Sequence, residues 1–177
     1  MCGIIGCISQ NNAPFKVFSG LQKLEYRGYD SWGISFKSCN GIETIKRVGK
    51  VSRPEKGSLN HNSYCSIGHT RWATHGKVTE KNAHPQLSND GNISLVHNGI
   101  VENFEELKSF LEKNGYKFSS QTDTEVIVNL IQFFFEPTKN LLQATRLALQ
   151  KIAGSYAVVA IHKNSFEMVG ARNGSPL

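Results

Sequence analysis

Residues 1–8 read MCGIIGCI, and this short apolar run is the part of the chain that decides the fold. Cys2–Ile8 has the length of a single strand and is apolar throughout, which predicts a strand buried in the protein interior. Gly3 and Gly6 interrupt the run and no basic segment precedes it, so the pattern is not that of a signal peptide. The second residue of the chain therefore stands at the start of a buried strand.

Cys2 gains a second reactive group if the initiator Met1 is removed, and the cysteine side chain is small enough to permit that removal. A free thiol has a pKa of about 8.5 and a free α-amine one of about 7.7–8.0. Part of such an amine is unprotonated at neutral pH and can accept the thiol proton, as in N-terminal threonine nucleophiles. Gly3 would let a substrate approach the backbone closely. Taken alone, the tripeptide favours a buried structural cysteine, and an attached Met1 would turn the amine into an amide that is no base.

The composition is that of one globular domain spanning 1–177. The net charge of +6 comes without any Lys/Arg run of five or more, so a nucleic-acid partner is not expected. No apolar stretch is long enough to span a membrane, so a membrane partner is not expected either. The cysteines, Cys2, Cys7, Cys39 and Cys65, form no CxxC pair and no zinc-binding spacing. We therefore expect no metal, no cofactor and a reducing cytoplasmic location.

Hydrophobic periodicity in the rest of the chain predicts a layered α+β arrangement rather than a regular βαβ array. The predicted strands after 2–8 are 32–37, 42–48, 64–69, 93–97, 155–162 and 166–171. The predicted helices are 14–24, 103–115, 122–135 and 141–152. The first helix has an apolar face formed by Phe15, Phe18, Leu21 and Leu24.

Several of these boundaries rest on local signals. Capping boxes at Asn103–Glu106 and Thr122–Glu125 predict two helix starts, and Pro137 predicts a helix end. Asn98-Gly99, directly after a strand, is typical of a turn. Residues 72–92 show no period and predict a long loop, which in a compact domain is usually functional.

Four residues offer the groups that acyl transfer from an amide needs beside a nucleophile. Arg71 can bind a carboxylate with two parallel hydrogen bonds, and Asp123 can pair with an ammonium group. Asn98 and Gly99 supply a side-chain NH2 and an uncovered backbone N–H, the donors of an oxyanion hole. Each also has a structural interpretation: a surface salt bridge for Arg71, a hairpin turn for Asn98-Gly99, and a favourable helix N-terminus for Asp123.

Seven segments, in order along the chain, make it similar to class II glutamine amidotransferases, in the form that is the glutaminase domain of glucosamine-6-phosphate synthases. They read MCGIIG (1–6), LEYRGYDS (24–31), HTRWATHG (69–76), NAHP (82–85), VHNGIVEN (96–103), TDTEV (122–126) and GSPL (174–177). Since they extend from one end of the chain to the other, the resemblance does not rest on one short motif.

The resemblance implies an N-terminal-nucleophile hydrolase fold, which is a four-layer αββα sandwich of the α+β class. It implies that the last strands of this domain are missing from the 177 residues. The sugar-isomerase modules that bind fructose 6-phosphate are absent as well, and would belong to the full-length protein or to a separate partner. A homodimer is left open.

The resemblance also implies roles for individual residues. Cys2 would attack the side-chain amide of L-glutamine and form a glutamyl thioester, with its own α-amine as base and with Asn98 and Gly99 as the oxyanion hole. The implied substrate-binding residues are Arg71, Trp72, Thr74, His75 and Asp123, and the implied supporting residues are Gly3, Arg27 and His84. No cofactor and no metal take part.

Other interpretations remain open at this point. The glutaminase domain of amidophosphoribosyltransferases shares the cysteine and the Asn-Gly pair, as does asparagine synthetase, although segments 26–30 and 71–76 fit the hexosamine enzyme better. A non-catalytic domain that binds glutamine or a partner, and a structural or redox cysteine protein, are further alternatives. Trp32 departs from the family, which has a small residue there. An indole would overpack a tight site by about 1–3 kcal/mol, unless the cavity is enlarged or the residue lies at a partner surface.

Overall fold

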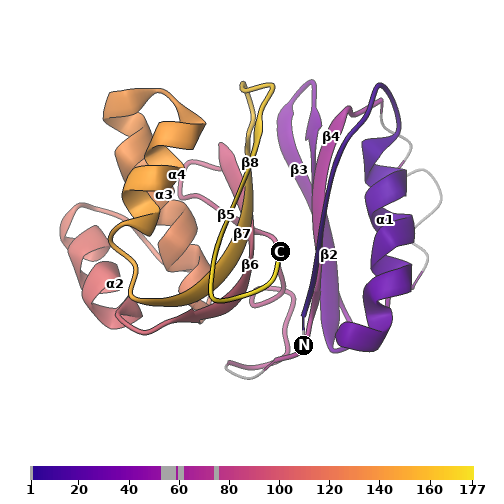
Figure 1. Cartoon of the computed structure of the whole chain (residues 1–177), viewed down its shortest axis with the longest axis horizontal. Helices are drawn as coiled ribbons and strands as arrows, with labels where there is room; N and C mark the ends of the chain where they lie inside the picture. The colour runs from indigo at the N-terminus through magenta and orange to yellow at the C-terminus, as the bar shows by residue number, and fades with distance from the viewer. Residues whose placement is uncertain (1, 53–58, 60–61, 74–75) are drawn as a thin grey trace.

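The structure is a computed structural model that describes residues 2–52, 59, 62–73 and 76–177. Two four-stranded antiparallel sheets face each other in the middle of the molecule (Figure 1). Helix α1 covers the outer face of the first sheet, and α2, α3 and α4 cover the outer face of the second (Figure 1). The expected four-layer αββα sandwich of the α+β class is therefore confirmed.

The first sheet has the strand order β1-β4-β2-β3 and the second β5-β6-β7-β8. The strands are β1 (Gly3–Ile8), β2 (Ser31–Ser38), β3 (Gly41–Val48), β4 (Cys65–Arg71), β5 (Gln86–Leu87), β6 (Ile93–Val101), β7 (Gly154–His162) and β8 (Met168–Asn173). The helices are α1 (Ala13–Leu24), the 3-10 turn η1 (Glu25–Arg27), α2 (Phe104–Lys113), α3 (Asp123–Thr138) and α4 (Leu141–Leu149).

Apolar side chains fill the three spaces between the four layers. The space under α1 holds Val17, Phe18, Leu21, Trp32, Ile34 and Phe36. The space between the sheets holds Cys65, Ile67, Val96, Val159 and Ile161. The space under α2–α4 is the largest and includes Leu95, Ile127, Ile131, Leu141 and Val158. Because each sheet buries both faces, its central strands consist almost wholly of buried residues, as in β2 and β4.

The prediction of a turn at Asn98-Gly99 is wrong, because both residues lie inside β6. They face Ala157 and Tyr156 of β7 in the antiparallel register, and the strand continues to Val101. Gly99 has a φ of +132°, a conformation that residues with a Cβ rarely adopt. The glycine thus allows an unusual backbone conformation within a strand and does not form a turn.

Both predicted capping boxes are absent, although the helices begin where they were expected. The side chain of Asn103 bonds to the carbonyl of Lys151 and to the N–H of Ala153 instead of capping α2. The carboxylate of Glu125 accepts hydrogen bonds from Ser119 and Ser120, so it holds the segment before α3. Tertiary partners have replaced the local ones at both helix starts.

Several element boundaries also differ from the prediction. Helix α3 includes Pro137 and ends at Thr138, and α4 ends at Leu149. Phe15 is 55% exposed, because the buried face of α1 is formed by its neighbours Ala13, Pro14 and Val17. The predicted loop 72–92 contains the short strand β5, and β8 begins at Met168.

Trp32 lies in the interior and not at a surface. Its side chain is fully buried under α1, where it contacts Phe18 at a ring-centroid distance of 5.8 Å. Its indole N–H donates to the carbonyl of Lys50 at 3.0 Å. The apolar space under α1 therefore accommodates the indole, with its one polar atom paired.

Among the described residues, no helix is long and apolar enough to cross a membrane.

Candidate active site

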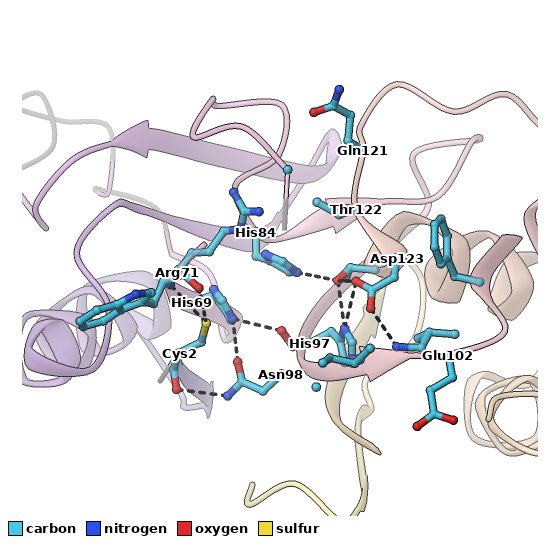
Figure 2. Close-up of a pocket in the computed structure, with 17 residues that line it drawn as sticks. Cys2, His69, Arg71, His84, His97, Asn98, Glu102, Gln121, Thr122 and Asp123 are labelled. Carbon is cyan, nitrogen blue, oxygen red and sulfur yellow. Dashed lines mark hydrogen bonds and ion pairs between the residues drawn. The ribbon is translucent and has the colours of Figure 1, made fainter. Parts of the chain in front are cut away.

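A cavity of about 550 Å³ opens where the ends of β1 and β4 meet β6 and the start of α3 (Figure 2). It therefore draws its walls from both sheets. Most of the residues expected at the site line it, namely Cys2, Arg71, Trp72, His84, Asn98, Gly99 and Asp123. Segments that are far apart in the sequence are brought together here by the packing of the two sheets.

Cys2 reaches the cavity because β1 pairs with β4, with Gly3 opposite Thr70. The backbone N–H of Trp72 donates to Cys2 Sγ at 3.2 Å, and the same sulfur lies 3.6 Å from the Trp72 carbonyl oxygen. Both contacts tie the Cys2 side chain to the main chain of the segment after β4.

The segment after β4 is tied to the start of β2 by Asp30. One oxygen of its carboxylate accepts the N–H of Ala73, and the other accepts the hydroxyl of Ser31 at 2.7 Å. The backbone N–H of Asp30 also donates to the carbonyl of Arg71 at 3.2 Å. Asp30 thus holds the main chain that presents the Trp72 N–H to Cys2.

Asn98 carries an amide whose two ends point in opposite directions (Figure 2). Its Nδ2 donates to the carbonyl oxygen of Cys2 at 3.3 Å, and its Oδ1 lies 2.9 Å from His69 Nε2. The same His69 nitrogen lies 3.1 Å from the carbonyl oxygen of His97. Both of its neighbours are acceptors in this arrangement, so His69 Nε2 carries the proton. The NH2 of Asn98 is therefore turned toward Cys2.

Arg71 and Asp123 bring opposite charges to the cavity. Arg71 is largely buried and donates to the carbonyl of Lys77 at 3.4 Å. Asp123 accepts the N–H of Val101 at 3.0 Å through Oδ2, and its Oδ1 lies 3.7 Å from His97 Nδ1. The Asp123 side chain is 27% exposed, so its carboxylate remains open to the cavity.

Three buried histidines, His69, His84 and His97, form the floor of the cavity around Thr124. The rings of His69 and His84 stack at a centroid distance of 4.3 Å. The hydroxyl of Thr124 lies 2.6 Å from His84 Nε2 and 3.1 Å from His97 Nδ1. These side chains therefore link β4, the middle of β6 and the start of α3.

Burial keeps these histidines neutral at physiological pH. It lowers the pKa of His69 to about 4 and that of His84 well below its usual 6.5. Burial also lowers the pKa of His97, although Asp123 raises it in part. The ion pair between these two residues is therefore weak, because the imidazole is mostly uncharged.

The remaining predicted residues lie outside the cavity wall or outside the described residues. Gly3 faces α1, and a Cβ there would lie 2.8 Å from Thr70 Oγ1, so the glycine serves close packing beside Cys2. Arg27 is half-buried in η1 and does not line this cavity. Thr74 and His75 lie outside the described residues.

Sequence reasoning missed His69, His97 and Thr124 as cavity residues. His69 precedes Arg71 by two positions on β4, and alternate residues of a strand share one face. That alternation was a signal that His69 lies on the same side as Arg71. Within the described residues, no group of three or more His, Cys, Asp or Glu is arranged to hold a metal ion.

A family model and individual relatives both match this chain. The family described as "Glutamine amidotransferase domain" matches residues 69–176. The chain is 47% identical over 185 residues to glutamine–fructose-6-phosphate aminotransferase [isomerizing] of Thermus thermophilus, and 44% identical over 181 residues to the protein of that name from Thermotoga maritima. Both matches cover 100% of this chain and 29% of the relative. The chain therefore spans under a third of the length of these relatives.

Two solved structures share the fold. One is the glutamine phosphoribosylpyrophosphate amidotransferase of B. subtilis in complex with ADP and GMP, with a TM-score of 0.80 and 27% identity. The other is described as the allosteric regulatory enzyme of purine biosynthesis, with a TM-score of 0.82 and 28% identity. Each alignment covers 98% of this chain and 37% of the other.

Proposed function

This chain belongs to the glutamine amidotransferase domain family, and on that premise we propose that it cleaves the side-chain amide of L-glutamine with Cys2 as the nucleophile. The observation that carries the proposal is the orientation of Asn98. Its NH2 points to the backbone of Cys2 at 3.3 Å, in a cavity that also holds Arg71 and Asp123. A nucleophile, an oxyanion donor and two charged anchors thus lie in one cavity.

The reaction proceeds in two acyl-transfer steps. The sulfur of Cys2 attacks the amide carbon, and its proton passes by way of the α-amine to the departing nitrogen. Ammonia leaves and a glutamyl thioester remains. Water then attacks the thioester, the α-amine takes a proton from that water, and the sulfur leaves to restore Cys2 and release glutamate. Asn98 Nδ2 and the backbone N–H of Gly99 stabilise the oxyanion in both steps.

Charge complementarity supports glutamine as the substrate. Arg71 binds the α-carboxylate and Asp123 binds the α-ammonium of a free amino acid. Trp72 covers one side of the cavity, and its ring packs against Tyr29 at a centroid distance of 5.3 Å. Thr74 and His75, in the same segment as Trp72, are proposed to contact the substrate as well, and both lie outside the described residues. His84 supports the floor of the cavity through its contact with Thr124. Gly3 and Arg27 support the segments around Cys2.

The base in this mechanism is the α-amine of Cys2, so the proposal requires that Met1 is removed. Met1 lies outside the described residues. A free amine and a thiol on one residue form a self-contained nucleophile and base, and no further side chain is then needed to accept the thiol proton.

We propose further that residues 1–177 form one glutaminase domain that supplies ammonia for glucosamine 6-phosphate synthesis from fructose 6-phosphate. The names of the relatives at 44–47% identity support this pathway over the purine pathway, whose solved structures share 27–28% identity. The partner is then a fructose-6-phosphate isomerase domain, in the same protein or in another chain. Free cysteines at the described positions suit a cytoplasmic location, and a homodimer is compatible with the fold.

The test is glutamate release by protein whose intact mass shows that Met1 is absent. We expect glutamine-dependent glutamate formation from the wild type and its loss, by three orders of magnitude or more, in Cys2→Ala, because the covalent step is removed. Cys39→Ala is the matched control, since Cys39 is exposed in the turn after β2 and does not line the cavity. Equal rates in wild type and Cys2→Ala would refute the mechanism. Glutamine binding without turnover in the wild type would favour a non-catalytic binding domain.

A further inference from the structure

The amide of Asn98 can serve as an oxyanion donor in only one of its two orientations. An asparagine amide has a donor end and an acceptor end of nearly equal size, so shape alone does not choose between them. In the reversed orientation the carbonyl of Asn98 would face the carbonyl of Cys2, and the oxyanion hole would present an acceptor where a donor is needed. The carbonyl of Cys2 favours the NH2 on its own side of the amide, and a second neighbour acts on the Oδ1 end.

His69 is that neighbour, and its own proton is fixed by the main chain. Its Nε2 lies 3.1 Å from the carbonyl of His97, which can only accept. The proton that this carbonyl requires on Nε2 then also faces Asn98 Oδ1 at 2.9 Å. A reversed amide would bring its NH2 against this N–H, and two donors would then face each other at an imidazole that is itself fully buried.

The ring of His69 is itself held from its other side. It stacks on His84 at 4.3 Å with an interplanar angle of 28°, and His84 Nε2 is 2.6 Å from Thr124 Oγ1. Because His69 is fully buried, no water can replace its hydrogen bond to Asn98. The chain of contacts leads from Thr124 on α3 through His84, in the loop before β5, to His69 on β4, and ends at the Asn98 amide on β6.

We propose that His69 is a positioning residue for the reaction, which holds the NH2 of Asn98 toward the developing oxyanion through its own Nε2–H. This inference rests on the proposed glutaminase function. His69 touches neither the substrate nor the sulfur in this scheme and acts only through Asn98. It therefore affects the transition state, in which the oxyanion exists, and leaves ground-state binding of glutamine largely unchanged.

The test compares His69→Leu, which removes the donor, with His69→Gln, whose amide NH2 can occupy the place of Nε2. We expect His69→Leu to lower kcat about a hundredfold, as loss of an oxyanion donor does, with KM within threefold of wild type. The kcat of His69→Gln should be at least tenfold higher than that of His69→Leu. His162→Leu is the matched control, because His162 is also buried and ring-stacked, on Phe135 at 4.3 Å, yet does not line the cavity.

A double-mutant cycle with Asn98→Ala separates positioning from a general structural role. If His69 acts through Asn98, then His69→Leu adds less than a threefold further loss of kcat in the Asn98→Ala background. Multiplicative losses in the double variant, or equal losses in His69→Leu and His69→Gln, would overturn the inference. Should His69→Leu not fold, a folded His69→Gln with kcat more than tenfold lower and unchanged KM would overturn it as well.

A magnetic-resonance measurement tests the same inference without turnover. The side-chain NH2 protons of Asn98 should show a nuclear Overhauser effect to the Cys2 backbone in the wild type and in His69→Gln, and should lose it in His69→Leu. Retention of that effect in His69→Leu would contradict the positioning role. Failure of the proposed function is distinguishable, because it would show as an absence of Cys2-dependent glutamate release in the wild type.

Discussion

Gly99 combines an unusual backbone conformation with close packing against β7. Its φ of +132° is unusual for any residue with a side chain, and a Cβ at this position would collide with the carbonyl oxygen of Ser155 on β7. The proposed oxyanion donor therefore sits where the strand pairing leaves no room for a side chain. A glycine here avoids that collision and allows β6 to remain paired with β7.

We expect Gly99→Ala to lower the free energy of unfolding by about 2–5 kcal/mol, from backbone strain of about 1–2 kcal/mol and overpacking of about 1–3 kcal/mol. Gly91→Ala is the matched control, because Gly91 has a φ of +70° and nothing lies within 4 Å of the Cβ position. It should lose only the backbone contribution. Urea unfolding of both variants measures the difference, and equal losses would mean that the Ser155 contact is relaxed at little cost.

At the scale of secondary structure, β4 and β6 carry most of the site and two of its three buried histidines. His69 and Arg71 lie on β4, and His97, Asn98 and Gly99 lie on β6. The two strands belong to different sheets, and their ends meet at the cavity. Histidines buried at such a junction link the stability of the strands to pH.

We expect the protein to lose stability as the pH falls from 7 to 5. The pKa values of His69, His84 and His97 are lowered in the folded state, so below pH 6.5 the unfolded chain binds protons that the folded chain does not. Each such histidine then lowers the free energy of unfolding by up to about 1.4 kcal/mol per pH unit. The contribution of His69 levels off only near its folded pKa of about 4. Above pH 6.5 both states are neutral at these positions and this dependence vanishes.

Urea unfolding at several pH values between 7 and 5 measures this slope. The His69→Gln variant provides the comparison, because glutamine does not titrate. Its slope should be smaller than that of the wild type by about the contribution of one histidine. If the free energy of unfolding changes with pH equally in the two proteins, His69 does not contribute to the pH dependence of stability.

At the scale of the whole molecule, the site is divided between two sheets that are held together by a thin apolar layer. Cys2 and Arg71 come from the side of the first sheet, and Asn98 and Gly99 come from the second. Ile67 lies in the layer between the sheets, whereas Ile34 lies on the far side of the first sheet, under α1. Only the first of these layers sets the distance between the two halves of the site.

We therefore expect Ile67→Ala and Ile34→Ala to differ in activity more than in stability. Both remove a fully buried isoleucine, and each should cost about 2–5 kcal/mol of unfolding free energy. Ile67→Ala should also lower kcat for glutamate release by roughly tenfold or more, because small displacements of the reacting groups slow the reaction strongly. The rates are compared at a temperature where both variants are folded. Equal kcat values would show that the spacing of the sheets tolerates the cavity.

Much of the fold and of the candidate site follows from local sequence signals. The apolar run after Cys2 predicted β1, and apolar periodicity predicted the four helices and most strands to within a few residues. The chemical character of Arg71, Asn98 and Asp123 predicted an anion partner, an oxyanion donor and a cation partner, and all three line one cavity. These features depend on residue type and on near neighbours, which the sequence states directly.

Other features were decided only by contacts between distant segments. Asn98-Gly99 was predicted to be a turn, yet pairing with residues some sixty positions later, Ala157 and Tyr156, keeps both in a strand. The orientation of the Asn98 amide depends on His69, which no local pattern relates to it. Chain order determined which groups are present, because side-chain chemistry and short-range periodicity are local properties. Tertiary structure decided which of them face one another, because strand pairing and sheet packing join residues that the sequence keeps apart.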